Sequence, residues 1–302
     1  MNVSSLSAVA SFLPPQVQRE ERHGYFVAGT GTPVLMLHSS LSSKSQWTTL
    51  AERMASRFKV IAVDLCGYGD NALPKAEASF TLDDEVALVT ARLHRLVNAS
   101  ESVHVVGHSY GALVALRLAH CLRGRIASLA LFEPVAFSVL EEKEPALKDL
   151  WQIAEGVSRS LVSGHRHDAA RSFVDFWSGE GSYASMPLPA QASLARRVDK
   201  VPFDFRAVRG WPEDARDLRV SAVPTLLLSG SRSPAVVQLI HALLARTLPN
   251  VRTGSFDCGH MGPVTHPHLI NPWIEAFVDM CCERDATIAP RAGAVPSLRA
   301  AD

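Results

Sequence analysis

The sequence lacks an excess of charge of either sign. Thirty lysines and arginines balance thirty aspartates and glutamates over 302 residues, and no block of basic residues stands out. Nucleic acids and anionic membrane surfaces are bound by basic patches, so neither is indicated as a partner. We therefore expect a small-molecule partner, with no nucleic acid and no membrane, and leave the formation of a homodimer open.

Cysteine and long apolar runs are also scarce. The five cysteines are an odd number without CxxC or zinc-finger spacing, which is typical of reduced thiols in a cytosolic protein. No apolar run approaches the roughly 20 residues that span a bilayer. The mildly apolar residues 6–13 have no basic stretch before them and are followed by Pro14 and Pro15, so no signal peptide is predicted. We expect a cytoplasmic protein.

Short apolar runs alternate with longer segments of helical periodicity. This order is typical of the α/β class, in which helices cover both faces of a mostly parallel sheet. The predicted strands are 25–28, 33–37, 59–64, 103–106, 126–132, 224–229 and 251–256, the first two forming a hairpin. The predicted helices are 46–56, 82–97, 110–122, 234–248 and 271–283.

The alternation stops between residues 136 and 218. This segment is helical in texture and rich in aromatic residues, namely Trp151, Phe173, Phe176, Trp177, Tyr183 and Trp211. We interpret 136–218 as a helical cap inserted into a core made of 20–135 and 219–285; a second helical layer packed on the sheet is the alternative. Residues 1–19 and 286–302 are expected to be flexible termini.

A serine lies between two glycines in Gly107-His108-Ser109-Tyr110-Gly111, where an apolar run gives way to a helical one. A serine hydroxyl attacks only when a base takes its proton, and it must project clear of its own backbone. A tight strand-to-helix turn projects it, and the crowding of that turn favours glycine two residues away on either side. The spacing therefore predicts a nucleophilic Ser109, against the alternative of a turn without chemistry.

With this motif the sequence resembles the α/β-hydrolase family over about residues 25–283. The resemblance implies the α/β-hydrolase fold, a mostly parallel central sheet flanked by helices with an inserted helical cap. It makes Ser109 the serine of a nucleophile elbow and the backbone amides of Ser40 and Tyr110 the oxyanion hole. In the loop that carries Ser40, the family usually has the sequence His-Gly-x, and this chain has Ser39 in place of the glycine.

The same resemblance places Asp64, whereas the aromatic composition of the cap places Trp177 near the substrate. Asp64, at the start of a D-x-x-G-x-G turn, is expected to brace a loop and not to serve as a catalytic acid. The residues that we expect to bind substrate are His38, His108, Trp177 and Met261.

His260 is the predicted catalytic base among twelve histidines. It follows the last apolar run, so that a loop above the strand ends carries it toward Ser109, and it resembles the catalytic histidine of the family. A neutral imidazole there would act first as a base and then as an acid. The pairs His165/His167 and His266/His268 lack a third ligand nearby, so neither a metal nor a cofactor is predicted.

The acid is where the pattern departs from the family. Its usual position, in a G-x-x-D loop after the strand that follows the cap, holds Ser233. Some members, haloalkane dehalogenases among them, place the acid after the strand that follows the nucleophile helix, and Glu133 stands there in this chain. We predict Glu133 as the acid and keep Asp257, Asp204 and the absence of an acid as alternatives.

A serine nucleophile argues against the dehalogenase and epoxide-hydrolase branches, because their ester intermediate needs a carboxylate nucleophile. We expect a carboxylesterase-like serine hydrolase that forms an acyl-enzyme through a Ser-His-acid triad and cleaves an ester or similar acyl bond of a small or medium apolar substrate. C–C bond, lactone or amide hydrolysis and perhydrolysis remain open. A small-ligand-binding protein with weak catalysis is the alternative from another class.

Overall fold

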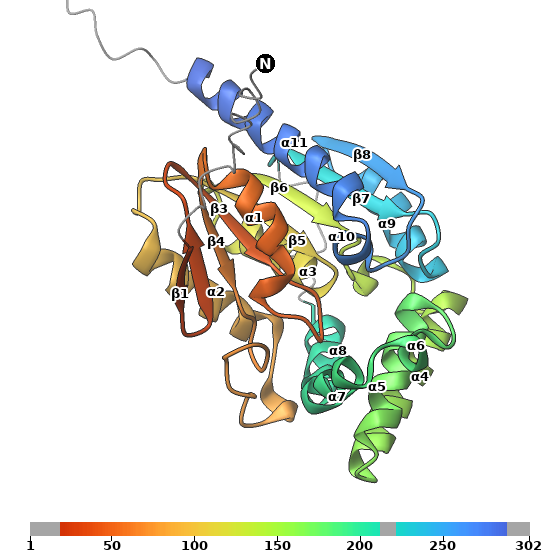
Figure 1. Cartoon of the computed structure of the whole chain (residues 1–302). Coiled ribbons are helices and arrows are strands. Elements are labelled where there is room, and N and C mark those ends of the chain that lie inside the picture. Colours follow the sequence, from red (N-terminus) through yellow and green to blue (C-terminus); the bar gives the residue numbers. More distant parts are fainter. Residues whose placement is uncertain (1–18, 212–221, 289–302) are drawn as a thin grey trace, which may run out of the picture.

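An eight-stranded sheet lies at the centre of the structure, a computed structural model that describes residues 19–211 and 222–288 (Figure 1). The strand order is β1-β2-β4-β3-β5-β6-β7-β8, with β1 and β2 antiparallel to their neighbours and all other pairs parallel. The predicted α/β class is thus confirmed. The strands are β1 (Arg19–Arg22), β2 (Tyr25–Ala28), β3 (Thr32–Leu37), β4 (Phe58–Val63), β5 (Val103–His108), β6 (Ile126–Phe132), β7 (Thr225–Gly230) and β8 (Val251–Phe256).

The hairpin predicted from the first two apolar runs is wrong. β2 pairs with β1 and β4, whereas β3 lies between β4 and β5. The chain passes from β2 to β3 through Gly29, which has a φ of 74°. A Cβ on Gly29 would lie 2.0 Å from the carbonyl oxygen of Ala55, because the turn packs against the segment that leads into β4. β1 escaped prediction because its four residues, Arg-Glu-Glu-Arg, are all charged.

Alternate side chains of the parallel strands point to opposite faces of the sheet, and each face has its own apolar core. Leu35 and Leu37 of β3 pack with α2, α3 and α9, whereas Val34 and Met36 pack with α1 and α11. These helices are α1 (Thr48–Met54), α2 (Leu82–Leu96), α3 (Tyr110–Cys121), α9 (Ala235–Thr247) and α11 (Pro267–Ile288). None of the helices in the described part of the chain is long and apolar enough to cross a membrane.

Helix α11 begins four residues earlier than predicted and ends at Ile288, inside the segment 286–302 that was expected to be flexible. At the other end, Arg19 was placed in the flexible segment 1–19 and belongs to β1. The rest of both predicted termini lies outside the described residues.

In the described part of the chain, five helices are inserted between β6 and β7. They are α4 (Pro145–Val162), α5 (Arg166–Ser178), α6 (Ser182–Ser185), α7 (Leu188–Arg197) and α8 (Val201–Arg209). Figure 1 shows them grouped together, in green and teal, at the opposite end of the molecule from α11. Their aromatic side chains pack edge to face, as Phe173 does with both Trp177 and Phe205. We keep the name cap for these helices. The predicted end of the cap, at residue 218, lies outside the described residues.

One more short helix, α10 (Gly262–Thr265), and four 3-10 turns complete the described elements. The turns are η1 (Lys44–Trp47), η2 (Glu77–Ser79), η3 (Phe137–Val139) and η4 (Val198–Lys200).

Asp64 braces the loops that follow β3 and β4. Its buried carboxylate accepts hydrogen bonds from the backbone amide of Lys44 (2.6 Å), the Nζ of Lys44 (2.8 Å) and the backbone amide of Asp70 (3.1 Å). A Cβ on Gly69 would lie 2.1 Å from the carboxyl carbon of Asp64, so only glycine fits in this turn. This is the bracing position that the sequence predicted for Asp64.

The turn from β5 into α3 lies directly against the end of β3. A Cβ on Gly111 would be 2.4 Å from the carbonyl oxygen of His38 and 2.5 Å from that of Leu37. A Cβ on Gly107 would be 2.6 Å from the Cα of Ala112. Both glycines are therefore required by close backbone approach, and not by an unusual φ of their own.

We predict that Gly111→Ala lowers the free energy of unfolding by about 1–3 kcal/mol, because its methyl group would collide with backbone that cannot rotate away. The matched control is Gly156→Ala inside α4, where a Cβ meets nothing within 4 Å. Helix propensity alone should make that control more stable by about 1 kcal/mol. Urea unfolding followed by circular dichroism measures both; a Gly111→Ala protein as stable as the wild type would contradict the packing described.

Candidate active site

Three side chains from separate parts of the sequence form one hydrogen-bonded line. The Oγ of Ser109 lies 2.8 Å from the Nε2 of His260, and the Nδ1 of His260 lies 2.6 Å from the Oε2 of Glu133. Ser109 is in the turn between β5 and α3, Glu133 directly follows β6, and His260 is in the loop between β8 and α10. All three are buried. The structure thus brings together the serine, base and acid that were selected from the sequence.

Strained backbone is concentrated at this edge of the sheet. The non-glycine residues with positive φ in the described chain are Ser109 (55°), Glu133 (46°) and Leu41 (58°). Two belong to the hydrogen-bonded line, and Leu41 lies in the loop after β3 that also lines the cavity at Ser109. Side chains other than glycine adopt this conformation at a cost of about 1–3 kcal/mol, and such strain clusters at functional sites.

Glu133 is held in place by both of its carboxylate oxygens. Oε2 contacts His260, while Oε1 accepts a hydrogen bond from the backbone amide of Gly230 at 2.7 Å. Gly230 is the last residue of β7, the strand after which the family most often carries the acid. In this chain that strand instead donates a hydrogen bond to the acid. Ser233, at the usual position of the acid, is buried, and its Oγ has no hydrogen-bond partner among the described residues.

The other two candidate acids lie elsewhere. The side chain of Asp257 is 83% exposed and pairs with Arg232. Asp204 is on α8, where its carboxylate contacts the hydroxyl groups of Ser40 (2.6 Å) and Tyr68 (2.5 Å). Within the described structure, Glu133 is the carboxylate that contacts His260.

Two histidines expected at the substrate do not line the cavity. His38 is buried, where its Nε2 accepts a hydrogen bond from the Leu65 amide (3.0 Å) and its Nδ1 lies 2.7 Å from the carbonyl oxygen of Ser39. Burial lowers the pKa of His38 to about 4, so the ring is neutral at pH 7. The expectation fails because the loop after β3 turns this side chain inward, under the loop.

His108 is the second of these corrections. Its Nε2 donates to the backbone carbonyl of His260 at 2.8 Å, and its Nδ1 accepts from the amide of Gln46 at 3.1 Å. The carbonyl oxygen of Gln46 in turn accepts hydrogen bonds from the amide and the hydroxyl of Ser39. Burial lowers the pKa of His108 well below its usual range. A series of hydrogen bonds from Ser39 through Gln46 and His108 to His260 therefore joins the loop after β3 to the loop that carries His260.

A cavity of about 140 Å³ opens above Ser109 and His260. Trp177 and Met261, both expected at the substrate, line it together with Phe173 and Leu194 of the cap. The ring of Trp177 stacks on the ring of His260, with centroids 4.4 Å apart and an interplanar angle of 27°. The walls are thus largely apolar, apart from the reacting groups, the serines of the loop after β3 and Ser178 of the cap.

A smaller void of about 20 Å³ adjoins Ser109 and is lined by Ser40 and Tyr110, the two expected oxyanion donors. Tyr110 is the first residue of α3, so its backbone amide has no intrahelical acceptor. Ser40 belongs to the loop after β3. Both residues therefore border the space in front of the Ser109 hydroxyl.

A buried lysine lies behind these two residues, and the sequence analysis did not find it. Lys200 is fully buried and pairs with Glu85 of α2 and with Asp204 of α8. Asp204 contacts the Ser40 hydroxyl, and Glu85 lies 3.3 Å from the Tyr110 hydroxyl. Burial raises the pKa of Asp204; burial opposes the charge of Lys200, but the two carboxylates still raise the pKa of Lys200. The only sequence signal was the spacing of Lys200 and Asp204, which is also typical of an exposed helical ion pair.

No group of three His, Cys, Asp or Glu side chains that could hold a metal ion occurs among residues 19–211 and 222–288. His167, one of the paired histidines considered from the sequence, lies 2.8 Å from the hydroxyl of Tyr183.

Known proteins are similar to this chain in sequence. The lipase LipV of Mycobacterium tuberculosis is 31% identical over 248 residues, which cover 78% of this chain and 88% of that protein. A poly(3-hydroxyalkanoate) depolymerase of Ectopseudomonas oleovorans is 27% identical over 263 residues, covering 86% of this chain and 88% of that protein.

Among solved structures, a thermophilic esterase from Thermogutta terrifontis is similar to 87% of this chain and 99% of its own, with a TM-score of 0.67 and 21% identity. At that identity the likeness concerns the fold. The profile of the alpha/beta hydrolase family matches residues 34–273, which include Ser109, Glu133 and His260. The protein therefore belongs to the alpha/beta hydrolase family.

Proposed function

We propose that this protein is a serine hydrolase that cleaves an ester or a similar acyl bond of a small or medium apolar substrate. The observation that carries the proposal is the buried line from Ser109 through His260 to Glu133 beneath a largely apolar cavity. The relatives named as a lipase and a poly(3-hydroxyalkanoate) depolymerase support hydrolytic chemistry.

In the proposed mechanism, the Oγ of Ser109 attacks the acyl carbon while its proton passes to the Nε2 of His260. The carboxylate of Glu133 stabilises the resulting imidazolium through Nδ1. His260 then gives the proton to the leaving oxygen, and an acyl-enzyme forms. A water molecule then attacks the acyl carbon while His260 takes its proton. The bond between the acyl carbon and Oγ breaks, His260 returns the proton to Ser109, and the acid is released.

The surroundings of His260 favour its transient positive charge. The His108 ring, with its centroid 5.3 Å away, stays neutral because burial lowers its pKa, so it adds no repulsion. The face of Trp177 lies against the imidazole, and an aromatic face attracts a cation. The Trp177 contact therefore stabilises the intermediate in which His260 carries the proton, and the neutral His108 does not oppose it.

The proposed oxyanion hole consists of the backbone amides of Ser40 and Tyr110. The Ser40 hydroxyl donates to the buried Asp204, and this hydrogen bond fixes the conformation of the loop that carries the Ser40 amide. Lys200 pairs with both Asp204 and Glu85 and offsets part of their negative charge near the developing oxyanion. We therefore assign Asp204 as a positioning residue that acts through Ser40.

The alternative from another class is a small-ligand-binding protein with weak or lost catalysis, motivated by Ser233 at the usual position of the acid. The contact of Glu133 with His260 favours the enzyme over this alternative.

Ser109 should react stoichiometrically with a fluorophosphonate, and His260→Ala should abolish the labelling because no base then activates the hydroxyl. Mass spectrometry of the intact and digested protein locates the label. Ser233→Ala, which removes another buried serine near the site, is the matched control and should label like the wild type. Labelling of a folded protein elsewhere than Ser109, or not at all, would refute the proposed nucleophile.

Glu133→Gln should lower kcat by a factor on the order of 10³ to 10⁴, because an amide cannot stabilise the imidazolium by charge. The substituted side chain can still accept the hydrogen bond from the Gly230 amide, so the fold should persist. Hydrolysis of p-nitrophenyl esters gives the rates, and circular dichroism checks the fold. Asp257→Asn, at an exposed site, should retain wild-type activity; the reverse pattern would remove Glu133 from the proposed triad.

The link from Asp204 to Ser40 can be tested by a double-mutant cycle on kcat. Asp204→Asn should lower kcat about tenfold, the effect of one hydrogen bond to a charged group. In a Ser40→Ala background the same change should have little further effect, because the hydroxyl through which Asp204 acts is gone. Effects that simply multiply would show that Asp204 supports the fold and does not act through Ser40.

A further inference from the structure

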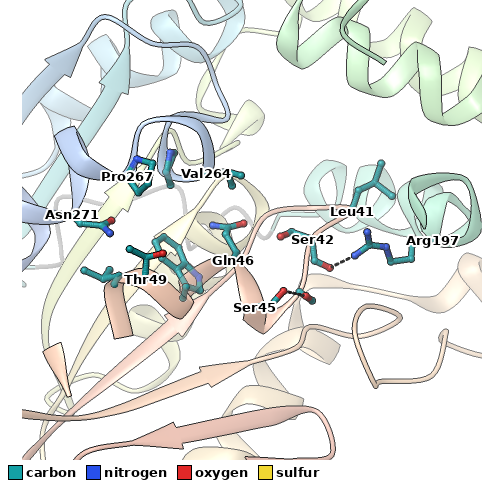
Figure 2. A pocket seen from close by; sticks show the side chains of 13 residues that line it. Leu41, Ser42, Ser45, Gln46, Thr49, Arg197, Val264, Pro267 and Asn271 are labelled. Carbon is teal, nitrogen blue, oxygen red and sulfur yellow. Dashed lines mark hydrogen bonds between the residues drawn. The ribbon is translucent and has the colours of Figure 1, made fainter. Parts of the chain in front are cut away.

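A second cavity, of about 320 Å³, lies beside the one above Ser109 (Figure 2). Its walls come from residues 41–50, from the end of α7 and from the segment containing α10 and the start of α11. Leu41, Ser42 and Val264 line both cavities, so these three residues form the boundary between them. We call this second space the side pocket.

Arg197 is the cation of the side pocket. It ends α7 and points toward Ser42, as Figure 2 shows. Its Nε and Nη2 contact the carbonyl and hydroxyl oxygens of Ser193 at 3.2 and 3.1 Å, and its Nη1 lies 3.4 Å from the Ser42 carbonyl oxygen. The last distance is long for a hydrogen bond, so Nη1 is only weakly engaged.

The partners of Arg197 are all neutral. Within residues 19–211 and 222–288, no carboxylate lies at ion-pair distance from it, in contrast to Arg166 of the same cap, which pairs with Asp199. Arg197 is half-buried, and burial lowers the pKa of its guanidinium. A partly desolvated cation without a counter-ion is stabilised by an anionic ligand.

Polar groups also line the other end of the side pocket. Asn271 is 3% exposed and lines this end. Trp47 is 1% exposed, and its indole Nε1–H has no acceptor there. Figure 2 shows Asn271 and Thr49 at the end of the pocket away from Arg197. Buried polar groups without partners are costly, and a polar ligand supplies those partners.

We propose that the side pocket binds a carboxylate at one end of the substrate, with Arg197 as its ionic partner. The inference rests on the proposed function, in which the apolar part of the substrate lies above Ser109. The cavity there is small, so a longer substrate extends past Ser42 and Val264 into the side pocket. A carboxylate fits the planar guanidinium, because both of its oxygens can accept parallel hydrogen bonds.

The test compares two p-nitrophenyl esters of equal chain length, one a monoester of a dicarboxylic acid and the other ending in a methyl group. A series of increasing length allows the carboxylate to reach Arg197 at one member. At that length the wild type should prefer the carboxylate ester in kcat/KM, and Arg197→Gln should reduce the preference about tenfold, chiefly through KM. Arg196→Gln, which removes the neighbouring exposed arginine outside the pocket, is the matched control and should keep the preference.

A second readout needs no change at Arg197. In the wild type, added salt should raise KM for the carboxylate ester and leave KM for the methyl-ended ester unaffected, because salt screens the ionic contact. An equal preference in Arg197→Gln and wild type, or no carboxylate preference at any length, would overturn the inference.

Binding to Ser109→Ala separates this inference from the proposed function. Calorimetry with the methyl monoester of the best dicarboxylic acid should show binding that is weakened about tenfold by Arg197→Gln, whether or not the wild type is catalytic. Labelling of Ser109 without a carboxylate preference would refute the side pocket alone. Binding through Arg197 without labelling would refute the proposed nucleophile alone.

Discussion

The contact between the turn at Ser109 and the end of β3 is the constraint on which the rest of the site depends. Gly111 lies so close to the backbone of Leu37 and His38 that no Cβ fits between them. This contact sets the loop after β3, with Ser40, directly in front of the serine hydroxyl. Because β5 is flanked by β3 and β6, Glu133 emerges on the other side of the same turn. Neighbouring parallel strands thereby assemble the site at one edge of the sheet.

A second set of contacts joins the cap to this edge. Lys200 and Asp204 come from the cap, whereas Glu85, Ser40 and Tyr110 come from the core. Burying a lysine with two carboxylates is costly unless their geometry is good, and removing one partner leaves uncompensated charge. The cluster therefore favours one position of α8 over the loop that carries Ser40. The stacking of Trp177 on His260 orients α5 in the same way.

Much of the fold and the line of three residues could be predicted from the sequence, because each rests on a local pattern. Apolar runs marked the parallel strands, the two glycines marked the turn at Ser109, and the length of one helix and one strand placed Glu133 at the same edge. The side-chain contacts of His38 and His108 could not be predicted, because the Leu65 amide and the His260 carbonyl that hold these rings come from distant parts of the chain. Lys200 was missed because its burial depends on tertiary packing, and β1 because a charged edge strand carries no apolar signal.

The position of Glu133 also affects how such a protein can change. Ser109 and Glu133 are both on the continuous unit formed by β5, α3 and β6, which is complete before the cap begins. Lengthening, shortening or replacing the five inserted helices would therefore leave the spacing of nucleophile and acid intact. The loop after β7 is relieved of presenting a carboxylate, while the backbone amide of Gly230, at the end of β7 itself, still holds Glu133. Substrate range can thus diverge through the insertion while the reacting groups stay on an unbroken scaffold.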